Sequence, residues 1–232
     1  MSDVSIVIPT YNEAENIERL VEGISKLGLD AEIIIVDDNS PDGTGEIVEE
    51  LKKRYKNLQV LHRKTEKGLA SAVVKGFKAA HSSVIGVMDA DFSHPPKVIP
   101  ELLEPLQSGK ADLAIGSRYV TGGGIVGWNL LRKLTSRGAI LLARPLTPIK
   151  DSVSGFFFLK REAIEGSNLN PKGYKIGLEV IVKGRYKKAV EIPYIFVNRK
   201  EGKSKLSLTE YMNYIVHLLK LYSYKLGEII KG

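Results

Sequence analysis

Short apolar runs alternate with helical segments over the first two-thirds of this 232-residue chain, and this alternation most constrains its fold. The runs that predict strands are 4–9, 32–36, 58–62, 83–88 and 112–116. Between them, residue spacing and turn signals predict helices near 13–27, from about 44 to 55, and over 68–80. Such alternation is typical of parallel sheets, because each helix returns the chain to the start of the next strand. We therefore expect an α/β fold with a mostly parallel, doubly wound sheet and helices on both faces.

The pattern changes after residues 122–124, which are three glycines. Residues 128–144 predict an apolar helix that carries several basic residues, and 156–159 and 190–194 predict short strands. The helix fits either a membrane interface or a protein core. Apolar and aromatic residues recur at helical spacing in the last segment: Tyr211, Tyr214, Ile215, Leu218, Leu219, Tyr222, Leu226 and Ile229. We expect a catalytic domain over 1–206 and an amphipathic helix over 207–232 that packs on the sheet, anchors at a surface or docks a membrane subunit.

The composition favours a globular protein with an anionic partner. Apolar residues make up 43% of the chain, and the net charge is +7 with an isoelectric point near 9.3. This balance suits a nucleotide, a lipid phosphate, a membrane surface or nucleic acid. The absence of cysteine excludes disulfides and thiolate chemistry. The N-terminus enters a strand directly, so we expect no signal peptide and a location on the cytosolic side.

Two carboxylates, Asp89 and Asp91, directly follow the predicted strand 83–88. The next residues, 92–96, include two prolines and cannot continue a central strand. The pair therefore lies at the carboxyl end of a core strand, where open α/β sheets bind ligands. Oxygen donors at positions i and i+2 suit a divalent cation, which can hold a diphosphate. The alternative is a solvated strand end with two acids.

Polar residues also follow the first two strands, and they suggest a slot for a nucleobase. Tyr11 can stack on a base, and Asp38 can accept hydrogen bonds from base N–H groups. The alternative is that both residues only shape turns. The first strand is not followed by a glycine-rich phosphate-binding loop, which argues against dinucleotide dehydrogenases and P-loop NTPases.

Basic residues gather in the second half of the chain, at Arg118, along the helix 128–144 and in the segment 199–205. They are natural receptors for phosphate oxygens, although a solvated basic face is the alternative. The glycine and serine within 199–205 suggest a loop that closes over a ligand. We expect no nucleic-acid partner, because a basic stripe with stacking aromatic residues is missing.

Eight ordered motifs resemble the dolichol-phosphate mannosyltransferases, which are family 2 inverting glycosyltransferases of the Rossmann-like GT-A fold. The motifs are VSIVIPTYNEAENI (4–17), VDDNSPDGT (36–44), DADFSHPP (89–96), GSRY (116–119), GGG (122–124), RKLTSRGA (132–139), DSVSGF (151–156) and EIPYIFVNRKEGKSKL (191–206). The resemblance implies transfer of mannose from GDP-mannose to dolichyl or another polyprenyl phosphate, with inversion. A glucosyltransferase that uses UDP-glucose and a catalytically silent nucleotide-sugar binding module remain alternatives.

The resemblance also implies roles for individual residues. Those implied to contact the donor nucleotide are Pro9, Tyr11, Glu13, Val36, Asp38, Ala90, Arg199 and Lys205. Asp89, Asp91 and Ser93 match the positions that bind Mg²⁺ or Mn²⁺, and the serine hydroxyl is the weakest of these ligands. Arg118, Arg132 and Ser136 match the positions that receive the lipid phosphate. Asp91 joins these three in the expected catalytic set.

The implied chemistry needs no catalytic histidine, because a phosphate monoester with a second pKa of about 6 is already an anion. The lipid acceptor implies a peripheral enzyme on the cytoplasmic face of a membrane. The expected partners are therefore GDP-mannose, dolichyl or polyprenyl phosphate, the membrane surface and, as one possibility, a separate membrane-anchor subunit.

Overall fold

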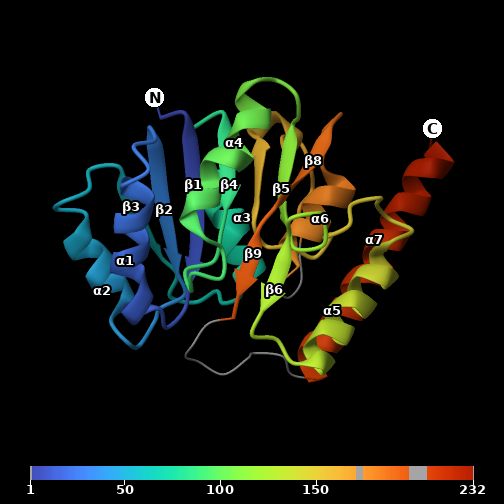
Figure 1. The fold of residues 1–232 in the computed structure, drawn as a ribbon, viewed down its shortest axis with the longest axis horizontal. Helices are drawn as coiled ribbons and strands as arrows, with labels where there is room; N and C mark the ends of the chain where they lie inside the picture. The colour runs from blue at the N-terminus through green and yellow to red at the C-terminus, as the bar shows by residue number, and fades with distance from the viewer. Residues whose placement is uncertain (1, 171–174, 199–207, 232) are drawn as a thin grey trace.

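A computed structural model describes residues 2–170, 175–198 and 208–231, and its centre is a mixed seven-stranded sheet (Figure 1). The strands are β1 (Val4–Thr10), β2 (Ala31–Asp37), β3 (Leu58–His62), β4 (Val84–Val87), β5 (Leu113–Ser117), β7 (Phe157–Lys160) and β8 (Ala189–Pro193). Their order across the sheet is β3-β2-β1-β4-β7-β5-β8. Strand β7 runs antiparallel to β4 and β5, and the other pairs are parallel. The mostly parallel α/β sheet expected from the sequence is confirmed.

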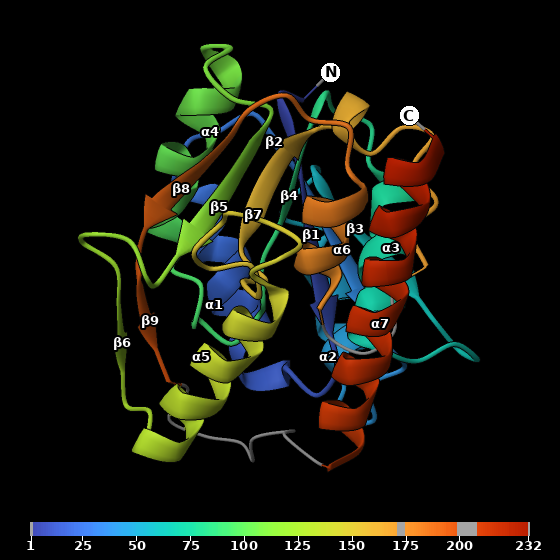
Figure 2. The same cartoon turned by 90° about the vertical axis from the view of Figure 1, so that its right-hand side faces the viewer.

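Helices cover both faces of this sheet, because its central strands are buried on both sides (Figures 1 and 2). One face packs against α1 (Ala14–Ser25), α2 (Thr44–Leu51) and α4 (Ile99–Gln107). The other packs against α3 (Leu69–Ala79) and α6 (Ile176–Lys183). Along β1, Ile6 and Ile8 belong to the first core and Val7 to the second. Each such buried aliphatic side chain stabilises the fold by about 1.5–3 kcal/mol.

Strand β1 is the point at which the strand order changes direction. The chain proceeds outward from β1 to β2 and β3, and then returns to place β4 on the other side of β1. The loops that follow β1 and β4 therefore leave the sheet in different directions, and a crevice forms at the carboxyl ends. This topology positions the candidate site.

Two elements extend the domain beside the sheet. A small parallel sheet joins β6 (Gly124–Val126) to β9 (Ile195–Val197), and α5 (Leu130–Ala143) lies beside α7 (Leu208–Lys231) (Figure 1). The hydroxyls of Tyr214 and Tyr222 on α7 donate to backbone carbonyls of α5, each over 2.6 Å. Buried Leu218 and Leu221 pack near Ala143 and Leu178. The C-terminal helix therefore packs on the domain through one side.

The other sides of α5 and α7 keep apolar residues in solvent. Of the two descriptions that the sequence allowed for α5, a core helix is wrong, because Ala143 is its one buried residue. The exposed apolar residues of the two helices include Leu130, Leu131, Leu134, Leu141, Met212, Ile215, Leu219 and Leu226. Among the described residues, the structure holds no helix that is both long and apolar enough to cross a membrane.

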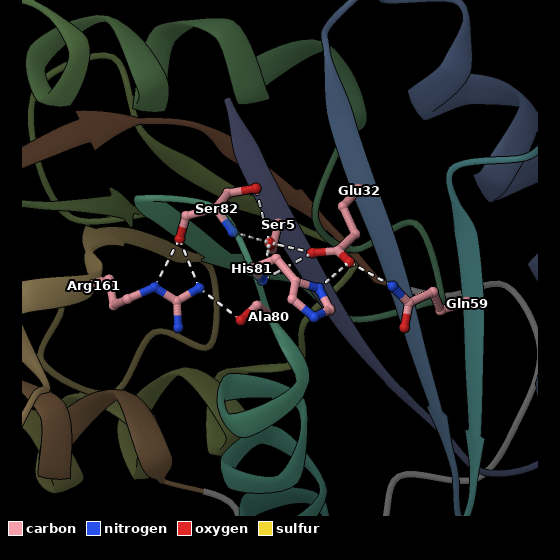
Figure 3. Close-up of polar contacts among 7 residues, drawn as sticks. All are labelled: Ser5, Glu32, Gln59, Ala80, His81, Ser82 and Arg161. Atoms are coloured by element: carbon pink, nitrogen blue, oxygen red, sulfur yellow. Dashed lines mark hydrogen bonds and ion pairs between the residues drawn. The ribbon is translucent and has the colours of Figure 1, made fainter. Parts of the chain in front are cut away.

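A partly buried polar cluster ties the amino ends of the strands together (Figure 3). Glu32 accepts hydrogen bonds from Ser5, Gln59 and the backbone N–H of His81. Arg161 donates to the carbonyls of Ala80 and Ser82, so it fixes the turn into β4. This cluster stabilises the sheet far along the strands from the candidate site.

Candidate active site

A cavity of about 920 Å³ lies at the carboxyl ends of β1, β2 and β4 and extends towards α5 and α7. The loops that bound its sheet end are tightly shaped. Asn12, Asn39 and Phe92, three described non-glycine residues with positive φ, lie just after β1, β2 and β4. Such angles are uncommon outside glycine and mark turns that the surrounding structure holds in place. Eleven predicted site residues line this one cavity: Pro9, Tyr11, Glu13, Asp38, Asp89, Ala90, Asp91, Ser93, Arg118, Arg132 and Ser136.

The two aspartates after β2 have different environments. Asp37 shapes the turn, because its carboxylate accepts hydrogen bonds from the Thr10 hydroxyl and from the backbone and hydroxyl of Ser40. Asp38 instead lines the same cavity as Tyr11, and its Oδ2 accepts the backbone N–H of Gly68 over 2.7 Å. Burial raises the pKa of Asp38, although the Gly68 bond and the charge of Arg63 act in the opposite direction. Asp38 is therefore the aspartate that can contact a ligand here.

The acidic pair lies on a loop held by a neutral histidine. Nδ1 of His94 accepts the backbone N–H of Asp89 over 2.9 Å, which leaves the ring proton on Nε2. The ring is buried and stacks on Phe156 with centroids 4.9 Å apart. Burial lowers the pKa of His94 to about 4, so it stays neutral near pH 7 and keeps accepting this bond. The backbone N–H of Ser93 donates to Oδ1 of Asp91 over 3.1 Å and closes the turn.

These residues fit a hard divalent cation. Asp89, Asp91 and Ser93 line the same cavity, and Oγ of Ser93 is buried with no hydrogen-bond partner among the described residues. The described chain has no cluster of three or more histidine, cysteine or acidic residues that could enclose a metal ion. Mg²⁺ and Mn²⁺ are commonly held by one or two carboxylates together with substrate phosphates. The donor set therefore matches a cation shared with a ligand, and not an all-protein metal cage.

The cationic end of the cavity is built on aromatic rings. Arg118 donates through Nε and Nη2 to the carboxylate of Asp151, each over 2.7 Å, and both side chains are buried. This fork keeps the pKa of Arg118 above its ordinary value, although burial alone would lower it. Arg132 lies 4.3 Å from the ring centre of Trp128 and donates to Asn198 over 2.8 Å. Two guanidinium groups are thus held in place before any ligand binds.

Three residues of this end were not identified from the sequence. Lys175, at the start of α6, lines the cavity; burial and the nearby charge of Arg118 lower its pKa to about 8. Trp128 Nε1 is a buried donor with no hydrogen-bond partner among the described residues. Asn198 holds Arg132. No motif surrounds Lys175, whereas the lone tryptophan between the triple glycine and the basic helix was a usable signal.

Three predicted site residues are not placed at the cavity. Val36 is fully buried and packs in the core between β2 and α3, so its side chain does not line the site. Arg199 and Lys205, and the expected closing of their loop, lie outside the described residues.

Ser136 lines the cavity and accepts a hydrogen bond from the Tyr119 hydroxyl over 3.0 Å.

A family model described as glycosyl transferase family 2 matches residues 5–166, which include the strand ends and the acidic pair. The chain therefore belongs to glycosyl transferase family 2.

Two relatives show which members of this family the chain resembles. The chain is 49% identical to a dolichol-phosphate mannosyltransferase of Pyrococcus furiosus, over 97% of its own length and 65% of that relative's length. It is 38% identical to the dolichol-phosphate mannosyltransferase of Saccharomyces cerevisiae, over 97% of this chain and 89% of the yeast protein. The resemblance to dolichol-phosphate mannosyltransferases is confirmed by these similarities.

Solved structures show the same fold at lower identity. Glucosyl-3-phosphoglycerate synthase from Mycobacterium tuberculosis, solved with Mn²⁺, UDP and glucosyl-3-phosphoglycerate, has a TM-score of 0.68 and 21% identity over 95% of this chain and 80% of that chain. A mannosyltransferase from Pyrobaculum calidifontis, solved with GDP-Man and Mn²⁺, has a TM-score of 0.64 and 17% identity over 97% of this chain and 64% of that chain. These likenesses confirm the GT-A-type fold.

Proposed function

We propose that this protein transfers mannose from GDP-mannose to dolichyl or another polyprenyl phosphate, with inversion at the anomeric carbon. One observation supports this most directly. A single cavity has a carboxylate and a tyrosine at one end, an acidic pair in the middle and fixed cations at the other end. That order matches a nucleobase, a diphosphate and an acceptor phosphate. The names of the relatives supply the sugar and the lipid.

The donor occupies the sheet end of the cavity in this proposal. The base stacks on Tyr11 and donates to Asp38, while Pro9, Glu13 and Ala90 line the space around it. Val36 lies in the core and does not line this space, so it takes no part in the proposed donor contacts. Arg199 and Lys205 complete the diphosphate contacts.

Asp89, Asp91 and Ser93 would hold the Mg²⁺ or Mn²⁺. When bound, such an ion neutralises charge that develops on the leaving diphosphate. The loop itself is fixed by His94, whose acceptor bond to the Asp89 backbone keeps both carboxylates at the cavity wall. Preorganisation of this kind avoids rearrangement during the reaction.

The acceptor phosphate binds at the cationic end. Arg132, Ser136 and the indole N–H of Trp128 offer it donors, and Arg118 adds a guanidinium whose plane Asp151 fixes. The phosphate is already ionised near pH 7, so no general base is needed for its attack. An acceptor held opposite the leaving diphosphate displaces it in line, and direct displacement inverts the anomeric centre.

The lipid tail leaves the cavity between α5 and α7. The cavity walls there include Leu142 of α5 and Tyr211, Tyr214 and Ile215 of α7. Beyond them, exposed apolar residues on both helices suit the boundary of a bilayer. We therefore propose that residues 1–206 form the catalytic domain, that residues 207–232 help it lie on the cytoplasmic face of a membrane, and that a separate anchor subunit is an alternative partner of this surface.

A donor panel tests the proposal. The purified protein is incubated with dolichyl phosphate and Mn²⁺ or Mg²⁺, together with GDP-mannose or UDP-glucose in turn, and the lipid product is analysed by mass spectrometry. We expect product from GDP-mannose, and loss of product when the cation is chelated. Product from UDP-glucose alone would identify a glucosyltransferase. Absence of transfer despite nucleotide binding would identify a silent binding module.

A further inference from the structure

Arg63 is a buried arginine next to the nucleotide end of the cavity, and the chemistry proposed above does not use it. Its side chain is fully inaccessible to solvent, which is rare for a charged residue. Its backbone N–H donates to the carbonyl of Asp37 over 2.8 Å, so the β2–β3 pairing continues one residue beyond His62. This register brings Arg63 directly alongside Asp38.

The guanidinium of Arg63 connects the proposed base-reading carboxylate to the loop beside it. Nη1 lies 2.9 Å from Oδ1 of Asp38 and donates to the Gly68 carbonyl over 3.2 Å. Nη2 donates to the hydroxyl of Ser71 over 2.7 Å, and that hydroxyl donates in turn to the Gly68 carbonyl. Gly68 then returns its N–H to Oδ2 of Asp38 over 2.7 Å. The segment 63–71 is thus closed around Asp38 by a ring of polar contacts.

Asp38 retains acceptor capacity within this ring. Its Oδ1 is buried 2.9 Å from Nη1 of Arg63 and accepts no hydrogen bond among the described residues, so a ligand reaches the carboxylate through Oδ2. An ionised carboxylate has about four acceptor positions, and Gly68 occupies one of them. Lys67, from the same segment, lies 5.6 Å from the centre of the Tyr11 ring, on the other wall of the proposed slot.

We propose that Arg63 is a positioning residue for base selection, and that it fixes the Asp38 carboxylate so that Oδ2 accepts the 2-amino group of guanine. The inference rests on the proposed use of a guanine nucleotide. A site built to hydrogen-bond a particular group discriminates strongly against analogues that lack it, because its own buried polar atoms are then left unpaired.

The charge of Arg63 is central to this role. The charged groups around Asp38 are Asp37 on β2, Arg63 after β3 and Lys67 on the following loop. Burial and Asp37 both favour the protonated form of Asp38, whereas Arg63 and Lys67 favour the carboxylate. Glu66 is exposed and lies 3.8 Å from Arg63. Among the described residues, removing Arg63 leaves the exposed Lys67 as the cation that still favours the carboxylate, so the carboxyl group becomes protonated more readily and loses acceptor strength.

The test compares GDP with inosine diphosphate, which lacks only the 2-amino group, by calorimetry in Mn²⁺. The variants are Arg63→Met, Arg63→Lys, Asp38→Asn and the double variant Arg63→Met/Asp38→Asn. Lys64→Met removes an exposed neighbouring cation and is the matched control. Thermal unfolding of each variant shows that it is folded, and the double variant avoids leaving a buried carboxylate without its cation.

We expect the wild type and Lys64→Met to prefer GDP by about tenfold or more, in line with one hydrogen bond to a charged group. Arg63→Met should lose this preference and regain part of it as the pH is raised from 6 to 8, because a higher pH favours the ionised Asp38. Arg63→Lys should keep part of it throughout the same pH series. In the Asp38→Asn background, Arg63→Met should cause no further change.

Other outcomes distinguish a failure of the role of Arg63 from a failure of the proposed function. A folded Arg63→Met protein that keeps the full preference for GDP overturns the role of Arg63 and leaves the proposed function intact. A preference lost equally in Arg63→Met and Arg63→Lys, with no dependence on pH, also overturns it, because Arg63 would then act only through packing. Equal binding of GDP and inosine diphosphate by the wild type would show that the 2-amino group is not recognised, which also overturns the role of Arg63. Failure of the wild type to bind GDP at all contradicts the proposed function itself.

Discussion

Lys175 should make the free protein less stable while helping it to bind phosphate. The lysine lies half-buried at the start of α6 and lines the cavity near the guanidinium of Arg118. Burial and that neighbouring charge lower its pKa from an ordinary 10.5 to about 8. We predict that Lys175→Met stabilises the free protein and weakens sugar transfer.

The magnitude follows from this difference in pKa. At about 1.4 kcal/mol per pH unit, a fall from 10.5 to about 8 corresponds to about 3 kcal/mol, an upper bound because water reaches part of the side chain. Because the folded pKa lies below the unfolded one, the cost is present in full below pH 8. It shrinks as the pH rises from 8 to 10.5, where the folded protein has already released the proton. Lys175→Met should therefore raise the free energy of unfolding above that of the wild type by about 2–3 kcal/mol at pH 7 and by under about 1 kcal/mol at pH 10.

Urea unfolding at pH 7 and pH 10, in a metal-free buffer with a chelator, measures this advantage. Lys187→Met, which removes an exposed lysine beyond α6, is the control and should leave stability within about 0.5 kcal/mol of the wild type. Transfer assays at pH 7 should show reduced sugar transfer by Lys175→Met and unchanged transfer by Lys187→Met. A Lys175→Met protein that is less stable than the wild type at pH 7, or equally active, would refute the reasoning.

Three further substitutions probe other parts of the structure. Asp91→Asn should abolish cation-dependent transfer without lowering the unfolding temperature, since Asp91 lies at the cavity wall; transfer at the wild-type rate would contradict its role. Asp151→Ala should destabilise the fold by about 3–5 kcal/mol in urea unfolding, because it leaves Arg118 buried without its carboxylate. Glu32→Ala should cost about 2–3 kcal/mol and spare transfer by the folded fraction. Although burial raises the pKa of Glu32, hydrogen bonds from Ser5 and His81 hold that pKa below its ordinary value, so this stabilisation should be lost in acid unfolding as the pH falls through the lowered pKa.

The strands were predictable because their signal is local and strong. Each central strand is a run of apolar residues buried on both faces, and each ends at polar residues, so its limits are correct to within about one or two residues. The site residues at these ends could be inferred for the same reason. Parallel strands end at one edge of the sheet, so Tyr11, Asp38 and Asp89 had to gather there.

Other elements were missed where the local signal was misleading. Helix α4 contains Pro100 and Pro105, and prolines usually indicate a break. Pro100 lies in the first turn, where no helical N–H is needed, and Pro105 is buried against the sheet, so packing outweighs propensity. The reversed direction of β7 and the three-residue strands β6 and β9 depend on long-range pairing, which a linear pattern does not contain. Helix α6, over residues 176–183, was likewise not predicted.

Arg63 and Lys175 were missed because nothing near them in the sequence separates them from the other basic residues. The chain has 34 lysines and arginines, and most such residues lie on protein surfaces. Only the register of β3 against β2 buries Arg63, and only the docking of α6 beside the loop 151–155 brings Lys175 to the cavity. Residues of this kind require tertiary structure for their identification.

The pairing of Arg118 with Asp151 has a consequence for anion binding. A guanidinium that already forms a two-point contact with a buried carboxylate carries little net charge for a second anion. Arg118 therefore helps an incoming phosphate mainly by offering Nη1, the nitrogen that does not contact Asp151, in a fixed orientation. It contributes less through attraction over a distance. The attraction must come from cations without a buried acid partner, and Lys175 is the cavity cation whose pKa shows that it is held at a cost. Ligand binding should therefore raise the pKa of Lys175 again, and the energy lost from the free protein becomes binding energy for the phosphate.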